Sequence, residues 1–505
     1  MYIRKTSQIK ISDDFFLPFG GKLNRNNRWV KLAELIPWSD FEDEYAQNFK
    51  SPTRGEEALS VRVALGTLII QTKLKLVDAE VPLQIMENPY LQYFLGFDSF
   101  EDDRPPFDAS LITHFRKRFT PDILLEINNI IAMKELESAV SNKRDDDNDD
   151  DDDHDKSGGC GTSEPTSEDV QLSFDDIPKQ GKLILDATCA PSDIRFPTDL
   201  RLLNEAREKL EDMIDTLHAP DISAASKPRT YRNRARKDYL SIEKQRKKRS
   251  KAIRKAIRKQ LGYVKRDLEY VAAYLEDPEK AGLLTKRQQR ELQTIRKLFE
   301  QQRYMYESRT HSVENRIVSI SQPYIRPIVR GKAGSDVEFG CKVMTSVVNG
   351  YTFIEKLDFD SYNEGILLQE AVEQYFRRFG FFPEAVLADS IFRNRENLAW
   401  LKLRGIRMSG PKLGRKPKVV NPETKKIERA DNGERNAVEG SYGVGKRKYG
   451  LDLIKAKLEN TAKSVIILQF LVMNLDRRLR SFLSQFYLQL IFAIRVNNLA
   501  AVNGL

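Results

Sequence analysis

The stretch GKLILDATCAPSDIRFPTDL, residues 181–200, decides the fold. Its apolar run Leu183, Ile184 and Leu185 leads directly to Asp186, as a buried strand ends at the edge of a sheet. A single aspartate in this position is weak evidence of chemistry, because aspartate commonly ends strands and caps helices. Its meaning depends on the elements that surround the strand.

The elements after this stretch predict a mixed α/β domain. Asn349-Gly350 supplies the turn of a β-hairpin expected over residues 338–359. Further expected elements are a helix at 364–380, a strand at 383–390, a helix at 395–405, a short strand at 406–411 and a long helix from about Arg435. The order strand, hairpin, helix, strand, helix, strand, helix is that of a ribonuclease-H-like fold with an open mixed sheet.

A helical insertion, residues 199–310, interrupts this order between the first strand and the hairpin. Apolar residues recur at spacings of four and three from Ile253 to Leu275, which is the seam of a coiled coil. Asp277-Pro278 breaks this helix and a second apolar helix follows. We therefore expect an antiparallel coiled-coil helical hairpin that projects from the α/β domain.

The insertion is strongly basic. Residues 227–266 contain eighteen Lys and Arg against two acidic residues, a density that calls for a polyanionic partner such as DNA or RNA. Arg254 and Arg258 are the candidate phosphate contacts on this helix. The alternative is a solvated helical face, although such a face normally balances its charges.

Residues 1–140 are expected to form a helical domain, with a clear buried helix at 57–76. A basic helix start near Ser110 carries Arg116 and Lys117, which suits a helix-turn-helix that binds DNA. A plain helical bundle with a basic face explains the same pattern equally well.

The remaining boundaries follow from composition. Residues 141–179 include the acidic run DDDNDDDDDHD (145–155) and are too polar to fold alone, so we expect a disordered linker. The α/β domain then comprises 180–198 and 311–480, and a helical tail comprises 481–505. The run SVIILQFLVMNL (464–475) is bounded by charges and is expected to be a core helix.

Composition excludes several classes of protein. The three cysteines and four histidines are isolated, so neither a disulfide framework nor a cysteine zinc site is expected. A histidine-based enzyme is excluded on the same ground. No long uncharged apolar stretch and no signal-like amino terminus occur, which places the expected location in the cytoplasm.

Three carboxylates occupy informative places in the expected order. Asp186 ends the first strand, Asp389 ends the strand at 383–390, and Glu439 lies early in the last helix. Mg²⁺ prefers carboxylate oxygens and water. Carboxylates that converge from separate elements can hold two Mg²⁺ or Mn²⁺ ions for in-line displacement at a DNA phosphodiester.

The carboxyl half resembles the DDE transposases of bacterial insertion sequences, in the group marked by a Tyr-Arg-Glu-Lys signature (the insertion sequence four/five superfamily). Arg435, Glu439 and Lys446 stand at the offsets of that signature, and Asn432 occupies the Tyr position. LILDATCAPSDIRFPTD and AVLADSIFRNREN resemble the two aspartate motifs. VALGTLIIQTKLKL, ENPYLQYFLGF and FDASLITHFRKRF resemble the common amino-terminal domain.

The resemblance implies that Asp186, Asp389 and Glu439 ligate the metals and that Arg435 and Lys446 contact transposon-end phosphates. From sequence alone, an ordinary intrahelical ion pair between Arg435 and Glu439 is the competing interpretation.

A turn-rich basic loop at 326–340 adds Arg330 and Lys332 as candidate DNA contacts, and a solvated loop explains the same pattern equally well. The implied reaction is cleavage at transposon ends followed by strand transfer into target DNA, by a homo-oligomer that is at least dimeric on DNA and associates with the nucleoid. A nuclease without joining activity and a catalytically silent DNA-binding remnant are the alternatives.

Overall fold

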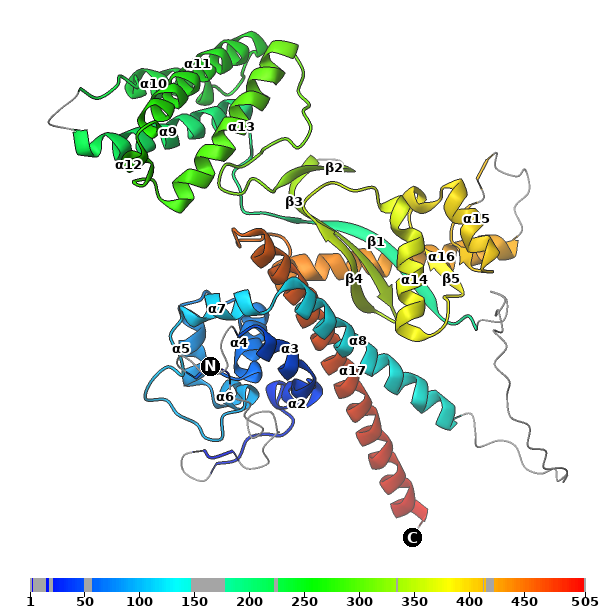
Figure 1. The fold of residues 1–505 in the computed structure, drawn as a ribbon. Coiled ribbons are helices and arrows are strands. Elements are labelled where there is room, and N and C mark those ends of the chain that lie inside the picture. The colour runs from blue at the N-terminus through cyan, green and yellow to red at the C-terminus, as the bar shows by residue number, and fades with distance from the viewer. Residues whose placement is uncertain are drawn as a thin grey trace, which may run out of the picture.

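The computed structural model describes most of the chain: residues 21–49, 57–146, 178–221, 226–332, 335–411 and 422–503, and a few single positions besides (Figure 1). Within these residues, helices surround one six-stranded sheet. Most of the segment predicted as an acidic linker lies outside the described residues. Its first residues belong to a helix, because α8 runs to Asp146.

The amino-terminal region is helical, as the sequence predicts. Its helices are α2 (Arg28–Leu35), α3 (Glu42–Gln47), α4 (Val61–Leu74), α5 (Glu80–Glu87), α6 (Pro89–Leu95), α7 (Leu111–Arg118) and α8 (Pro121–Asp146). The hydroxyl of Ser60 accepts a hydrogen bond from the Val63 amide and so caps α4. That helix ends at Lys75, which adopts a left-handed conformation.

The strands are β1 (Lys182–Pro191), β2 (Arg326–Lys332), β3 (Ser335–Val348), β4 (Tyr351–Asp358), β5 (Ala385–Leu387) and β6 (Arg407–Met408). The long strand β3 pairs antiparallel with β1 on one side. On its other side β2 pairs with the first part of β3 and β4 with the second part, both antiparallel. Beyond β1 the sheet continues with β5 and β6, each parallel to its neighbour.

The hairpin between β3 and β4 confirms the turn predicted from sequence. Asn349 and Gly350 both have positive φ, 49° and 84°, the combination that a two-residue hairpin turn of this hand requires. An added Cβ at Gly350 would also lie 2.1 Å from the Arg477 guanidinium, so that flexible side chain would have to move.

Two expected boundaries are wrong. The first strand does not end at Asp186 but continues to Pro191, because its antiparallel partner β3 stays paired with it as far as Gly340. On its other edge the parallel pairing with β5 stops at Ile184, so Asp186 lies where that edge opens. The last helix of the domain, α16 (Pro422–Val444), begins well before Arg435.

Each face of the sheet is covered differently. Leu183, Leu185 and Ala187 of β1 pack with α14 (Leu368–Phe379) and α15 (Arg395–Leu403) on one face. The opposite face packs against α16 and α17 (Glu459–Asn503). Since side chains alternate along a strand, Asp186 belongs to the face that α16 covers.

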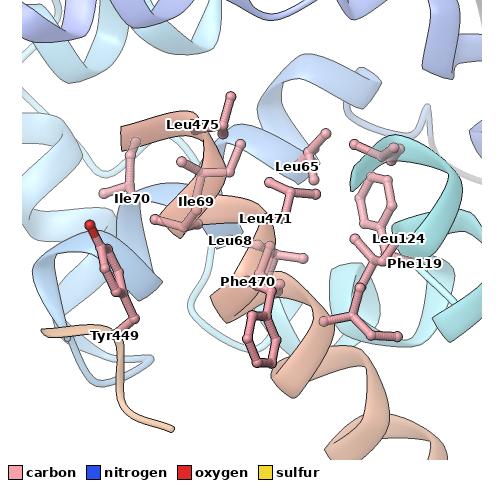
Figure 2. Packing of buried hydrophobic residues seen from close by; sticks show 14 of the residues in the cluster. Leu65, Leu68, Ile69, Ile70, Phe119, Leu124, Tyr449, Phe470, Leu471 and Leu475 are labelled. Carbon is pink, nitrogen blue, oxygen red and sulfur yellow. The ribbon is translucent and has the colours of Figure 1, made fainter. Parts of the chain in front are cut away.

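The helix predicted at 464–475 is confirmed as part of α17, and it is the centre of the largest core. Leu471 and Leu475 of α17 pack against Leu68 and Ile69 of α4, as Figure 2 shows. Among the described residues, no helix combines the length and apolar character needed to cross a membrane.

The insertion is a separate lobe in Figure 1. It comprises α9 (Asp199–His218), α10 (Arg232–Glu243), α11 (Ser250–Leu275), the short α12 (Pro278–Ala281) and α13 (Lys286–Ser308). The two helices expected from sequence are α11 and α13, but α9 packs along both and supplies much of the core, including Leu203 and Leu210. The lobe is thus a helical bundle, and its coiled-coil character remains a prediction.

Candidate active site

Strand register places Asp186 and Asp389 at a similar level of the sheet. In the parallel pair, Ile184 of β1 lies opposite Leu387 of β5, and each aspartate follows two residues later. Asp186 is half-buried, and its Oδ1 accepts a hydrogen bond of 2.8 Å from the Ala187 amide. Asp389 is exposed and caps the short helix that follows β5. The register therefore brings two acidic residues from separate motifs to one level of the sheet.

Tyr442 of α16 fixes this helix over Asp186. The Tyr442 hydroxyl donates to the backbone carbonyl of Asp186 at 2.9 Å and lies 2.6 Å from Thr345 Oγ1. Thr345 is the register partner of Asp186 on β3. Burial raises the pKa of the Tyr442 phenol well above its usual value, so the hydroxyl remains a donor at neutral pH.

Arg435, two turns earlier on α16, reaches the second aspartate. Its Nη1 lies 3.4 Å from Asp389 Oδ1. An intrahelical pair between Arg435 and Glu439, the competing interpretation from sequence, does not occur among the ion pairs of the described residues. Arg435 therefore links α16 to the segment after β5.

Two further ion pairs hold α16 against the sheet. Lys182 Nζ of β1 lies 2.6 Å from Glu434 Oε1, and Arg407 Nη1 of β6 lies 2.5 Å from Asp431 Oδ2. Asp431 is nearly fully buried, and its hydrogen bonds raise the pKa of Arg407 above its ordinary value. These two ion pairs attach α16 to β1 and to β6, the strands on either side of β5 in the sheet.

Glu439 is exposed on α16, one turn beyond Arg435. Among the described residues, no group of three Asp, Glu, His or Cys side chains is close enough to hold a metal ion. The donor chemistry still fits a hard divalent cation, because Asp186 and Asp389 offer carboxylate oxygens at one level of the sheet. The strand register places Asp186 and Asp389 at one level of the sheet, and a shared metal site of these two residues with Glu439 stays a prediction.

Lys446, the last residue of the signature, lies in an unusual turn. The helix runs through Gly443 and passes at Gly445 into one π-helical turn, Gly445–Tyr449, which ends at Gly450. An added Cβ at Gly445 would lie 2.5 Å from Leu451 Cδ1, so a side chain there would collide with the core. Lys446 is half-buried in this turn.

The amino-terminal candidates differ in their surroundings. Arg116 forms an ion pair with Asp78 and also donates to Gln71 at 2.8 Å, so it connects α7 with the end of α4. Lys117 is exposed. The structure therefore gives Arg116 a role in packing and leaves Lys117 available to a partner.

The candidates on the insertion differ in the same way. Arg254 donates to the carbonyl of Tyr306 at 2.9 Å and lies over its ring, so it joins α11 to α13. Arg258 is exposed. The turn-rich loop predicted at 326–340 is wrong, because Arg330 and Lys332 belong to strand β2, which pairs with β3. The side chains of both residues lie outside what the structure describes.

The contacts of Tyr442 and Glu434 were not found from sequence. A weak signal existed, because Val438 and Tyr442 continue the spacing of a buried helical face. The partners of these residues, however, lie on strands that are far away in the chain.

Two family models match parts of the chain. Residues 386–476 match the model described as Transposase DDE domain, and residues 18–118 match the model described as Transposase domain (DUF772). The first match contains Asp389, Arg435, Glu439 and Lys446, whereas Asp186 lies before it. Together the two matches support a DNA-processing enzyme of the insertion-sequence transposase class. The Tyr-Arg-Glu-Lys grouping remains a prediction.

A curated relative is similar over part of the chain. It is described as "Uncharacterized protein ORF8 in nfe locus" of Rhizobium meliloti and is 29% identical over 188 residues, which are 37% of this chain and 73% of that protein. No solved structure matches the chain.

Proposed function

We propose that this protein is a DDE transposase that cleaves DNA at the ends of a mobile element and joins the freed ends to target DNA. The observation that carries the proposal is the shared level of Asp186 and Asp389, with α16 tied to both. The catalytic domain is proposed to be ribonuclease-H-like. The strand order β4, β3, β1, β5, β6, antiparallel up to β1 and parallel beyond it, supports that assignment.

In this proposal Asp186, Asp389 and Glu439 are the residues that would hold two Mg²⁺ or Mn²⁺ ions. When bound, such ions activate the attacking oxygen and stabilise the leaving oxygen of a phosphodiester. The chain's own contribution is to fix the ligand-bearing elements. Arg435, already at Asp389, adds a positive charge beside the position of a DNA phosphate.

The partners proposed with this function are terminal-repeat and target DNA. Lys446, Lys117 and Arg258 are the predicted contacts whose side chains remain at least partly accessible. Arg330 and Lys332 stay in the proposal because the segment 326–332, which forms β2, is rich in basic residues. Holding two element ends at once calls for a dimer or larger assembly on DNA, in the cytoplasm at the nucleoid.

The test is cleavage and strand transfer on a labelled terminal-repeat duplex with Mg²⁺ or Mn²⁺. Asp389→Asn removes one charge and keeps the shape of the side chain. Glu396→Gln makes the same change at an exposed carboxylate nearby on α15 and serves as the matched control. We expect the first variant to lose products by a factor on the order of 10³ or more and the control to retain them.

The outcomes separate the alternatives. Cleaved ends without joined products would indicate a nuclease. Tight DNA binding without any metal-dependent product would indicate a silent remnant, and equal activity of the two variants would remove Asp389 from the site.

A further inference from the structure

Three hollows in the described residues meet along one seam of the molecule. The central hollow, of about 810 Å³, lies between the end of α4, α7 and the residues 449–458 that lead into α17. A second, of about 800 Å³, shares Lys117 and Thr461 with it. A third, of about 580 Å³, shares Lys75 and Tyr449. Neighbouring hollows share lining residues and are therefore adjacent, and we name the three together the seam groove.

The two walls of the seam groove are fastened to each other. Lys75 Nζ, from the end of α4, donates to the carbonyl of Arg447 in the π turn at 2.6 Å. Asp476 of α17 pairs with Lys73 of α4 and accepts a 2.7 Å hydrogen bond from the Tyr449 hydroxyl. These contacts join segments far apart in sequence, so the groove is formed before any partner arrives.

Two of the three hollows of the seam groove have a strongly basic lining, whereas the second hollow is nearly balanced, with four basic and three acidic side chains. Of the described side chains, five basic and two acidic ones line the central hollow, and six basic and one acidic line the third, with Lys75 common to both. Two of these acidic groups are already neutralised, Asp78 by Arg116 and Asp476 by Lys73. Each of these pairs uses one basic and one acidic side chain, so the surplus of positive charge comes from the basic side chains that have no acidic partner in the lining.

Lys448, Lys455 and Lys457 carry much of that surplus. All three are exposed, and none forms an ion pair with another part of the chain that the structure describes. Ammonium groups held along one depression without counter-charges lower their mutual repulsion when a polyanion binds. Nothing in the lining resembles a ladder of aromatic rings, since Tyr449 is the one aromatic residue among the described residues of the three hollows. Binding of single strands commonly depends on such rings.

We propose that the seam groove binds the phosphate backbone of duplex DNA. The inference rests on the proposed function, and it names a surface of which the sequence motifs identify only Arg116 and Lys117 and the carboxylate site identifies nothing. Its position supports this partner, because the groove-lining segment continues directly from α16, which carries Arg435 and Glu439. A duplex along the groove therefore lies close to α16, the helix that carries Arg435 and Glu439.

The experiment measures binding of the full-length protein to a fluorescein-labelled mixed-sequence duplex by anisotropy over a range of salt concentrations. Mixed sequence suffices, because backbone contacts do not read bases. The groove variant is Lys448→Gln/Lys455→Gln/Lys457→Gln. The control, Lys286→Gln/Lys297→Gln/Lys402→Gln, removes the same charge from exposed lysines on α13 and α15. Melting curves confirm that both variants fold.

Three lost phosphate contacts reduce the slope of log affinity against log salt by about 0.9 each. We expect the groove variant to bind on the order of 10²-fold more weakly near 0.1 M salt, with a slope smaller by about 2 to 3. The control should stay within about threefold of the unchanged protein.

Equal affinity and slope in the groove variant and the control would overturn the groove as a DNA site. The proposed function would survive that result, because cleavage is scored separately with Asp389→Asn. If the unchanged protein binds no duplex at all, both proposals are wrong. If it binds through the groove but never cleaves, only the proposed function is wrong.

Discussion

Removal of one hydroxyl, Tyr442→Phe, tests whether α16 is fixed over the sheet as described. The hydroxyl donates to the Asp186 carbonyl at 2.9 Å and contacts Thr345 Oγ1 at 2.6 Å, and the Thr345 side chain is fully buried. A typical hydrogen bond contributes about 1 kcal/mol, and a buried group left without a partner costs about 1 to 3 kcal/mol. We therefore expect the attachment of α16 to weaken by roughly 1 to 3 kcal/mol.

Native-state hydrogen exchange measures this loss locally, whereas global unfolding of a multidomain chain is not a two-state process. Weakening by roughly 1 to 3 kcal/mol speeds exchange of the α16 amides about 5-fold to 150-fold. Ser441→Ala is the control, because the Ser441 hydroxyl donates only within the helix, to the Ala437 carbonyl at 3.1 Å. In Ser441→Ala the α16 amides should exchange at nearly the rate of the unchanged protein.

The same substitution should also lower metal-dependent cleavage by about tenfold to a hundredfold while DNA affinity is retained, because small displacements of positioned groups are costly in catalysis. Exchange in Tyr442→Phe that matches Ser441→Ala would refute the reasoning. The hydroxyl would then not hold the helix.

The other predictions concern charge, pH and backbone space. Arg435→Met should change the free energy of unfolding by less than about 1 kcal/mol, since its ion pair is largely exposed, yet abolish strand transfer; a large stability loss would contradict this. Burial raises the pKa of Asp267 to about 7, so the folded chain keeps a proton that the unfolded chain releases above about pH 4. Stability of the insertion should therefore fall as pH rises from about 4 to 7, and thermal melts of Asp267→Asn should lack this fall. Gly340→Ala should destabilise by about 3 kcal/mol or more in denaturant titration, because its Cβ would lie 2.1 Å from the Ala190 carbonyl oxygen. Gly262→Ala, with no atom within 4 Å, should stabilise α11 by about 0.5 to 1 kcal/mol, and a loss there would show that the helix is strained.

Local patterns predicted the elements of the fold better than their ends. Asn349-Gly350 identified the hairpin because both residues tolerate positive φ, and the apolar run at 464–475 identified the core part of α17. The end of β1 could not be predicted in the same way. It depends on how far β3 remains paired with it, which is a contact between residues far apart in sequence.

The candidate site likewise combines features that local sequence predicts with contacts between segments that are far apart in the chain. Asp186 and Asp389 were predicted as site residues because each follows an apolar run, which is local information. The pairing of Arg435 with Asp389 was not predictable, because the nearer Glu439 is the ordinary helical partner by spacing alone. The partner of Arg435 depends on where α16 lies against the segment after β5, and no pattern within α16 encodes that contact between distant segments.

The relation between the amino-terminal helices and the sheet is a further non-local feature, and it bears on function. Asn128 of α8 and Asn474 of α17 both donate to the carbonyl of Thr352 on β4, at 3.1 and 2.8 Å, and Asn474 donates to Asn128 Oδ1 at 2.9 Å. All three residues are buried, so the network is costly to break. One hydrophobic cluster also spans these helices, α17 and a face of the sheet. An amino-terminal region attached in this way cannot swing freely as a separate DNA reader. Because its α4 and α7 form one wall of the seam groove, DNA held there would keep a fixed direction relative to Asp186 and Asp389.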